Sequence, residues 1–69
     1  MEILFKQRLQ QLRKDFNLTQ FELAEKINTT QRRISHMESG NVEPDLTTLI
    51  ALAKFFDVTT DFLLGISEF

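Results

Sequence analysis

Apolar residues recur along this chain with the spacing of one helical face, and no segment shows the strict alternation of a half-buried strand. The first segment carries its apolar residues four, three and four positions apart, at Phe5, Leu9, Leu12 and Phe16. Because this spacing places the four side chains on one side of a helix, we predict a helix over residues 3–15.

A capping box predicts where the second helix begins. Thr19 and Glu22 have the required spacing, in which the hydroxyl and the carboxylate each accept a hydrogen bond from the other residue's backbone N–H. We predict a helix over residues 20–27, whose apolar stripe consists of Leu23, Ala24 and Ile27. Asn28 is placed to end this helix, because asparagine tolerates the left-handed backbone conformation.

A third helix is predicted over residues 31–38. Thr30 is its expected N-cap, and Ile34 and Met37 form its buried face. Gly40 can take the positive φ that ends a helix.

The second half of the chain predicts two further helices, over residues 45–56 and 60–64. Residues 40–44 form a loop, because Pro44 disfavours helical backbone before it. Asp45 and Thr59 are the expected caps. The longer helix draws its apolar set from Leu46, Leu49, Ile50, Ala53 and Phe56. Residues 66–69 have no clear assignment. The pattern therefore predicts an all-α fold of five short helices in a single domain, residues 1–69.

Composition narrows the classes of function. The chain has 69 residues and no cysteine, which excludes disulfides and thiolate metal sites, and with a single histidine we expect no metal site. No apolar run approaches the roughly 18 residues that span a bilayer, and no leader resembles a signal peptide, so we expect a cytoplasmic protein. Ser35 and His36 are adjacent on a helix, so their side chains diverge and cannot form the nucleophile–base pair of an enzyme. We expect neither an enzyme nor a cofactor.

Charge is unevenly distributed, although the formal net charge is only −2. Residues 1–33 carry seven bases and four acids, whereas residues 34–69 carry one base and six acids. The distribution is either scatter on a solvated surface or the sign of a molecule with a basic and an acidic pole.

The segment from Gln20 to Ser39 meets the steric needs of a helix-turn-helix. Two helices that cross at about 90–120° through a tight turn need a small residue at their contact, which Ala24 supplies, and Asn28 suits the turn. With Ile34 and Met37 turned inward, the residues left to point outward are Gln31, Arg32, Ser35 and His36.

The stretch from Leu18 to Gly40, LTQFELAEKINTTQRRISHMESG, resembles the helix-turn-helix of phage Cro and repressor proteins, within the broader group of XRE-type regulators. The resemblance extends to residues 8–14, 44–54 and 58–64 and covers residues 4–65. It implies a compact five-helix, lambda-repressor-like domain that binds double-stranded DNA.

The resemblance also implies roles for individual residues. The positions that face base edges are Thr30, Gln31, Arg32 and His36. Those that meet the DNA backbone are Thr19, Gln20, Ser39 and the main chain near Asn41. Arg33 points outward and either reaches a phosphate or is only solvated. The resemblance further implies an ion pair between Arg13 and Glu38 that orients the third helix.

Two positions depart from the family pattern. The turn carries Asn28 where the family often has glycine. This difference is tolerable, because asparagine also adopts the left-handed backbone conformation. The loop after the third helix carries Asn41, Val42 and Glu43 where the family commonly has Lys or Arg, and Glu43 would repel a phosphate. We therefore expect modest affinity for the DNA backbone from one copy of the chain.

The resemblance implies a sequence-specific transcriptional regulator, a repressor in the first instance, that binds a palindromic operator as a homodimer. This segment is more apolar than one short helix can hide, so we expect the dimer to form through Phe62, Leu63, Ile66 and Phe69. The alternative is that Phe62 and Leu63 only close the core of the monomer. The alternatives are an antitoxin or other protein-interaction module whose DNA binding is secondary, a regulator of restriction-modification or plasmid copy number, and the N-terminal part of a longer regulator. Phe21 is expected to pack on the end of the 3–15 helix, with an exposed contact residue as the alternative.

Overall fold

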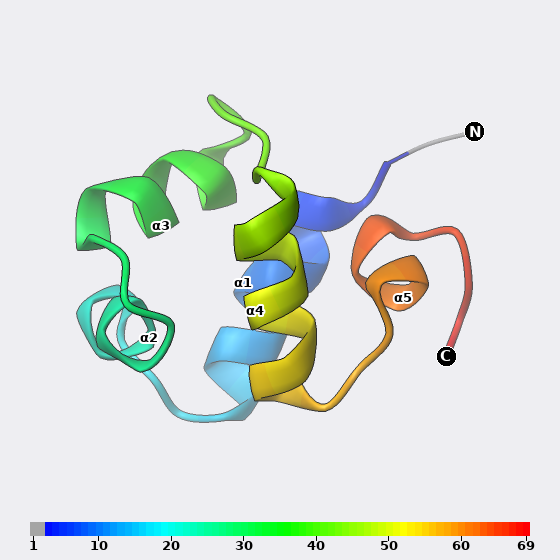
Figure 1. Cartoon of the computed structure of the whole chain (residues 1–69), viewed down its shortest axis with the longest axis horizontal. Helices are drawn as coiled ribbons and strands as arrows, with labels where there is room; N and C mark the ends of the chain where they lie inside the picture. Colours follow the sequence, from blue (N-terminus) through cyan, green and yellow to red (C-terminus); the bar gives the residue numbers. More distant parts are fainter. Residues whose placement is uncertain (1–2) are drawn as a thin grey trace.

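The computed structural model describes residues 3–69, which form five α-helices and no strand (Figure 1). In chain order these are α1 (Phe5–Asp15), α2 (Gln20–Lys26), α3 (Gln31–Ser39), α4 (Leu46–Phe56) and α5 (Thr60–Leu64). The predicted all-α class is confirmed. None of these helices is both long and apolar enough to cross a membrane.

Four of the predicted helices have bounds that are wrong by one or two residues, whereas α5 has its predicted bounds. The first helix begins at Phe5 and not at residue 3, since Leu4 is its N-cap, with a non-helical φ of −102° and ψ of 20°. The backbone N–H of Leu4 donates instead to the carbonyl of Leu64 at 3.0 Å. The second ends before Ile27, whose φ of −112° and ψ of 14° are no longer helical. The third continues through Ser39. The fourth begins after Asp45, whose backbone is extended.

One apolar core takes residues from all five helices. Its buried members are Phe5, Leu9, Leu23, Ala24, Ile34, Met37, Leu49, Leu52, Ala53, Phe56 and Leu63. The inward orientation predicted for Ile34 and Met37 is therefore confirmed, since both are fully buried. Leu63 is also fully buried, which corrects its predicted place in a dimer interface, because a side chain with no exposed surface cannot meet a second protein.

Three apolar residues that were expected to pack lie at the surface. Leu46, at the first position of α4, is 77% exposed, and Ile50 is 47% exposed. Successive residues turn by about 100° around a helix axis, so Ile50 points away from the core face that contains Leu49. Phe21 is 55% exposed and does not pack as predicted, because α2 buries its opposite side through Leu23.

The capping box predicted at the start of α2 is confirmed. The Thr19 hydroxyl accepts from the backbone N–H of Glu22 at 3.0 Å, and the Glu22 carboxylate accepts from the N–H of Thr19 at 2.9 Å. These hydrogen bonds favour the charged carboxylate and lower the pKa of Glu22 from its ordinary value of 4.5.

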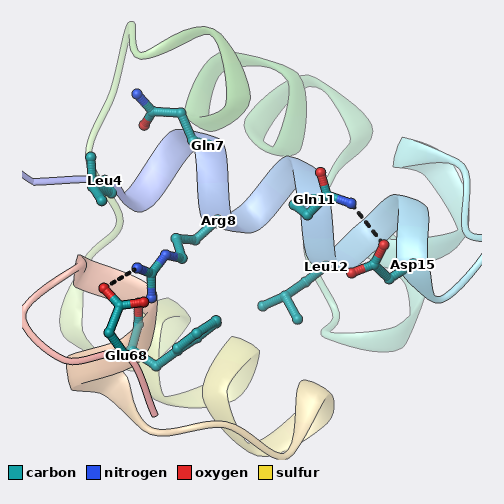
Figure 2. A pocket seen from close by; sticks show the side chains of 8 residues that line it. Leu4, Gln7, Arg8, Gln11, Leu12, Asp15 and Glu68 are labelled. Carbon is teal, nitrogen blue, oxygen red and sulfur yellow. Dashed lines mark hydrogen bonds and ion pairs between the residues drawn. The ribbon is translucent and has the colours of Figure 1, made fainter.

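Residues 66–69, to which the sequence assigns no secondary structure, fold back against α1, and Arg8 holds them there (Figure 2). Its guanidinium donates to the carbonyl oxygens of Phe62 at 2.8 Å and Ser67 at 3.1 Å. It also lies 4.2 Å from the centre of the Phe62 ring and 3.6 Å from the Glu68 carboxylate. One side chain of α1 thus fastens the C-terminal segment to the helical core.

Gly65 allows this close approach. Its φ is +84°, and a Cβ atom at this position would lie 2.8 Å from the Cβ and Cγ atoms of Leu4. Any other residue would have to displace Leu4 and adopt an unfavourable backbone conformation.

Replacing Arg8 by methionine should lower the free energy of unfolding by about 1–3 kcal/mol, because it removes two charged hydrogen bonds and a cation–π contact while keeping an apolar stem. Urea denaturation measures the change. Arg32→Met, at an exposed position of α3, is the control and should change stability by less than about 0.5 kcal/mol. Equal losses from both variants would contradict the role of Arg8.

The capping box should make stability depend on pH through Glu22. Its folded-state pKa is depressed, so its contribution is complete above its unfolded value and is lost as the pH falls through the lower folded value. Glutamine also completes a capping box but carries no charge. The melting temperature of the wild type should therefore exceed that of Glu22→Gln at neutral pH, and the difference should shrink as the pH falls below the ordinary value of 4.5. A difference that stays constant from neutral to acid pH would refute this account.

Candidate nucleic-acid interface

Helices α2 and α3 are joined by a turn of four residues and meet at Ala24, which is buried. Asn28 lies in this turn with a φ of 59°, the left-handed conformation expected of it. The N–H of Thr29 donates to the carbonyl of Ala24 at 2.9 Å and closes the end of α2. The small side chain and the left-handed turn together allow the two helices to cross closely.

One face of α3 is left outside the core. Ile34 and Met37 fill the buried side, while Gln31, Arg32 and Ser35 are exposed and His36 is half-buried. Figure 1 shows α3 along an edge of the molecule, with α2 beside its N-terminal end. This outward face presents amide, guanidinium, hydroxyl and imidazole groups, which can donate to or accept from base edges.

Thr30 begins α3 as its N-cap, since its hydroxyl accepts from the backbone N–H of Arg33 at 3.2 Å. Its exposed hydroxyl retains a proton to donate. Of the four residues expected to face base edges, Thr30, Gln31 and Arg32 lie at the start of α3, and His36 lies just past its middle.

The Glu38 carboxylate links three helices. Arg13, on α1, donates to it in a bidentate manner, with its Nε at 2.6 Å from Oε2 and its Nη2 at 3.0 Å from Oε1. The third guanidinium nitrogen of Arg13 donates to the carbonyl of Leu18 at 2.8 Å. The Glu38 side chain is only 3% exposed. Hydrogen bonding to Glu38 raises the pKa of Arg13 above its already high value.

Gln20 is the third member of this network. Its side-chain amide donates to Oε1 of Glu38 at 3.2 Å, which ties the start of α2 to α3. The sequence suggested a contact with the DNA backbone for Gln20 but gave no sign of this bond. The bond leaves the Gln20 carbonyl oxygen and its second amide hydrogen for another partner.

The end of α3 corrects one expected phosphate contact. The backbone N–H groups of Asn41 and Val42 both point back into the helix and donate to the carbonyl of His36, at 2.9 and 3.4 Å. They close the helix end and are not directed at a ligand, so Asn41 can offer only its exposed side chain. The Ser39 hydroxyl likewise donates to the carbonyl of His36, at 3.0 Å.

Arg33 forms an arrangement that the sequence did not indicate. Its Nη2 lies 3.2 Å from Oδ1 of Asp45, across the loop between α3 and α4. Asp45 has the backbone position of an N-cap, but its carboxylate accepts no hydrogen bond from an N–H of α4, which corrects its expected capping role. The pKa of Asp45 is lowered, first by the nearby Thr48 hydroxyl, then by its own backbone N–H and by Arg33.

A shallow depression of about 360 Å³ separates α3 from this acidic loop. Its walls are formed by Arg32, Arg33, His36, Val42 and Glu43. Arg32 and His36, two of the residues expected to contact bases, therefore lie in the same concave surface as Glu43.

Lys6 is a cation near this surface that sequence reasoning missed. Its Nζ lies 3.5 Å from the point that a Cβ atom of Gly40 would occupy, at the end of α3. Lys6 belongs to α1, and nothing in its local sequence indicates that it meets residue 40. Over residues 3–69, no group of three His, Asp or Glu side chains is placed to bind a metal ion.

The Glu38→Gln variant should reduce the free energy of unfolding by about 3 kcal/mol, because it leaves the largely buried Arg13 guanidinium without its counter-charge. Guanidinium chloride denaturation gives the difference. Glu25→Gln makes the same change of charge at an exposed site on α2 and should be nearly neutral. A Glu38 variant as stable as the Glu25 variant would show that the network contributes little.

Comparison with known proteins was consistent with this geometry. Residues 9–63 match the family HTH_3, described as Helix-turn-helix. The HTH-type transcriptional activator BcrR of Enterococcus faecalis is 45% identical over 64 residues, which are 93% of this chain and 31% of that protein. The chain spans about a third to three-fifths of the length of the curated relatives BcrR, ImmR and YobD, the last two from Bacillus subtilis.

Solved structures share the fold. A transcriptional regulator from Listeria innocua superposes with a TM-score of 0.88 at 32% identity, over 94% of this chain and 61% of that one. The P22 c2 repressor, solved in complex with a synthetic operator, gives a TM-score of 0.86 at 27% identity, over 91% of this chain and 96% of that one.

Proposed function

Since the chain belongs to the helix-turn-helix family of DNA-binding transcriptional regulators, we propose that it recognises a palindromic double-stranded operator as a homodimer. In this proposal α3 enters the major groove and α2 lies across the backbone. The family is not an enzyme class. A regulator acts where its DNA is, so we place the protein in the cytoplasm.

The observation that carries the proposal is the two-sided character of α3. One side is fixed by two fully buried residues, Ile34 and Met37, and by the Glu38 network, while the other side is polar and outward. A helix held rigidly on one side can present the other in a fixed register to a groove. The P22 c2 repressor, which has the same fold, supports this use of α3, because it has been solved on a synthetic operator.

We assign base reading to Thr30, Gln31, Arg32 and His36. Glutamine pairs in a bidentate way with N6 and N7 of adenine, and arginine with O6 and N7 of guanine. Each such pair contributes about 1–3 kcal/mol of discrimination between bases. The exposed amide of Gln31 and guanidinium of Arg32 supply these two chemistries side by side at the start of α3.

We assign contacts with the DNA backbone to Thr19, Gln20, Arg33, Ser39 and the side chain of Asn41, and the Ser39 hydroxyl has to turn its proton from the His36 carbonyl to a phosphate. Thr19 and Gln20 begin α2, where the N-terminal end of the helix favours a phosphate. Ser39 and Asn41 lie at the other end of the interface, beyond the base-reading residues. Such contacts fix the register of the protein on the duplex without reading its sequence.

The proposed dimer uses Ile66 and Phe69, which are 52% and 90% exposed. Phe62 adds a half-buried ring held beneath Arg8. Figure 1 shows this C-terminal segment on the side of the molecule away from α2 and α3. A two-fold contact there leaves both copies of α3 outward, and the two helices should enter successive major grooves about 34 Å apart.

Selection of bound duplexes from a random pool at fixed salt tests the proposal. A palindromic consensus, with half-sites about one helical turn apart, is the expected result. Recovery of no enriched sequence, together with binding that depends only on salt, would refute sequence-specific recognition.

Gln31→Ala should relax the preference at a single base position and weaken the selected site by about 1–3 kcal/mol. Gln20→Ala is the comparison and should weaken all duplexes to a similar extent, because it removes a backbone contact. Fluorescence anisotropy on the consensus and its single-base variants separates the two results. Equal losses that do not depend on sequence would contradict the assignment of Gln31.

A further inference from the structure

The ion pair between Arg33 and Asp45 crosses from α3 to the start of α4 beside the surface proposed to bind DNA. Arg33 shares a depression with Arg32 and His36, two of the proposed base-reading residues. Its guanidinium is therefore close to where a DNA strand would pass. In the protein without DNA, however, that guanidinium lies 3.2 Å from the Asp45 carboxylate.

A carboxylate and a phosphate offer the same ligand to a guanidinium, namely anionic oxygens that accept charged hydrogen bonds. Arg33 cannot direct the same N–H group at both. Asp45 is held in place, because its backbone caps the start of α4 and only one methylene group joins its carboxylate to that backbone. The carboxylate thus stays beside the interface while the flexible arginine side chain can change partners.

We propose that Asp45 is an internal substitute for phosphate, which holds Arg33 in the unbound protein and lowers DNA affinity until a backbone phosphate displaces it. The inference rests on the proposed function, because it requires that α3 meets DNA. It adds an affinity-setting role for Asp45, a residue that touches no DNA in the proposed complex.

Accessibility makes the exchange feasible. The side chains of Arg33 and Asp45 are 47% and 57% exposed, so water screens their attraction. A pair of this kind contributes little, and its loss corresponds to about a two- to five-fold change in an equilibrium constant. The pair is weak enough to exchange and strong enough for its effect on DNA affinity to be measured.

A simpler effect has to be separated from this exchange, because any acid near DNA repels phosphate. Glu43 provides the matched control, since it lies on the same loop and lines the depression with Arg33. It forms no ion pair within the part of the chain that the structure describes. Asp45→Asn and Glu43→Gln remove the same charge, but only the first releases Arg33.

The experiment measures the dissociation constant for a pool of random-sequence duplexes, about two to three helical turns long, by fluorescence anisotropy at two salt concentrations. Asp45→Asn should bind about two- to five-fold more tightly than Glu43→Gln. In the Arg33→Gln background this advantage should vanish. Arg33→Gln alone should weaken binding and reduce the slope of log K against log salt by about one.

Equal affinities of Asp45→Asn and Glu43→Gln would overturn the inference, as would an advantage that persists without Arg33. Asparagine is itself a good N-cap, so Asp45→Asn should fold, and circular dichroism checks this. Because the duplexes are of random sequence, the experiment can refute the role of Asp45 and sequence-specific recognition separately. Absence of a consensus refutes sequence-specific recognition but leaves this comparison valid, whereas failure of the wild type to bind any duplex refutes both.

Discussion

The Glu38 carboxylate belongs to α3, yet its hydrogen-bond donors come from α1 and α2. Rotation of α3 about its own axis would break these bonds while Arg13 and the carboxylate remain largely out of water. Desolvation offsets much of the attraction within such a pair, so its main effect is on geometry and less on total stability. The outward residues of α3 therefore keep one orientation, which a helix that inserts into a groove requires.

Opposite charges of the molecule meet around the loop between α3 and α4. Arg33 and Lys6 come from the basic half of the sequence, and Glu43 and Asp45 come from the acidic half. The fold brings them together because Gly40 turns the chain sharply back toward α1. In the proposed complex, DNA affinity would therefore depend on competition between the protein's own acids and the phosphates.

Much of the fold could be predicted from the sequence, because local signals determine it. Thr19 and Glu22 identified α2, and the spacing of Ile34 and Met37 identified the buried side of α3. Exposure of Leu46 could not be predicted, and exposure of Phe21 was only the alternative, since it depends on which neighbour covers each face. Two other contacts join separate segments of the chain, namely the bond from Gln20 to Glu38 and the ion pair of Arg33 with Asp45. The spacing of residues within one helix gives no indication of such contacts.

The contact between the two ends of the chain has a consequence for the order of folding. The backbone bond from Leu4 to Leu64 closes a loop of nearly the whole chain, and the entropy cost of closure grows with loop length. Contacts between α2 and α3 join sequence neighbours and carry a much smaller cost. We expect the helix-turn-helix to form early and the contact between Leu4 and Leu64 to form last. Opening of that contact is then the first step of unfolding.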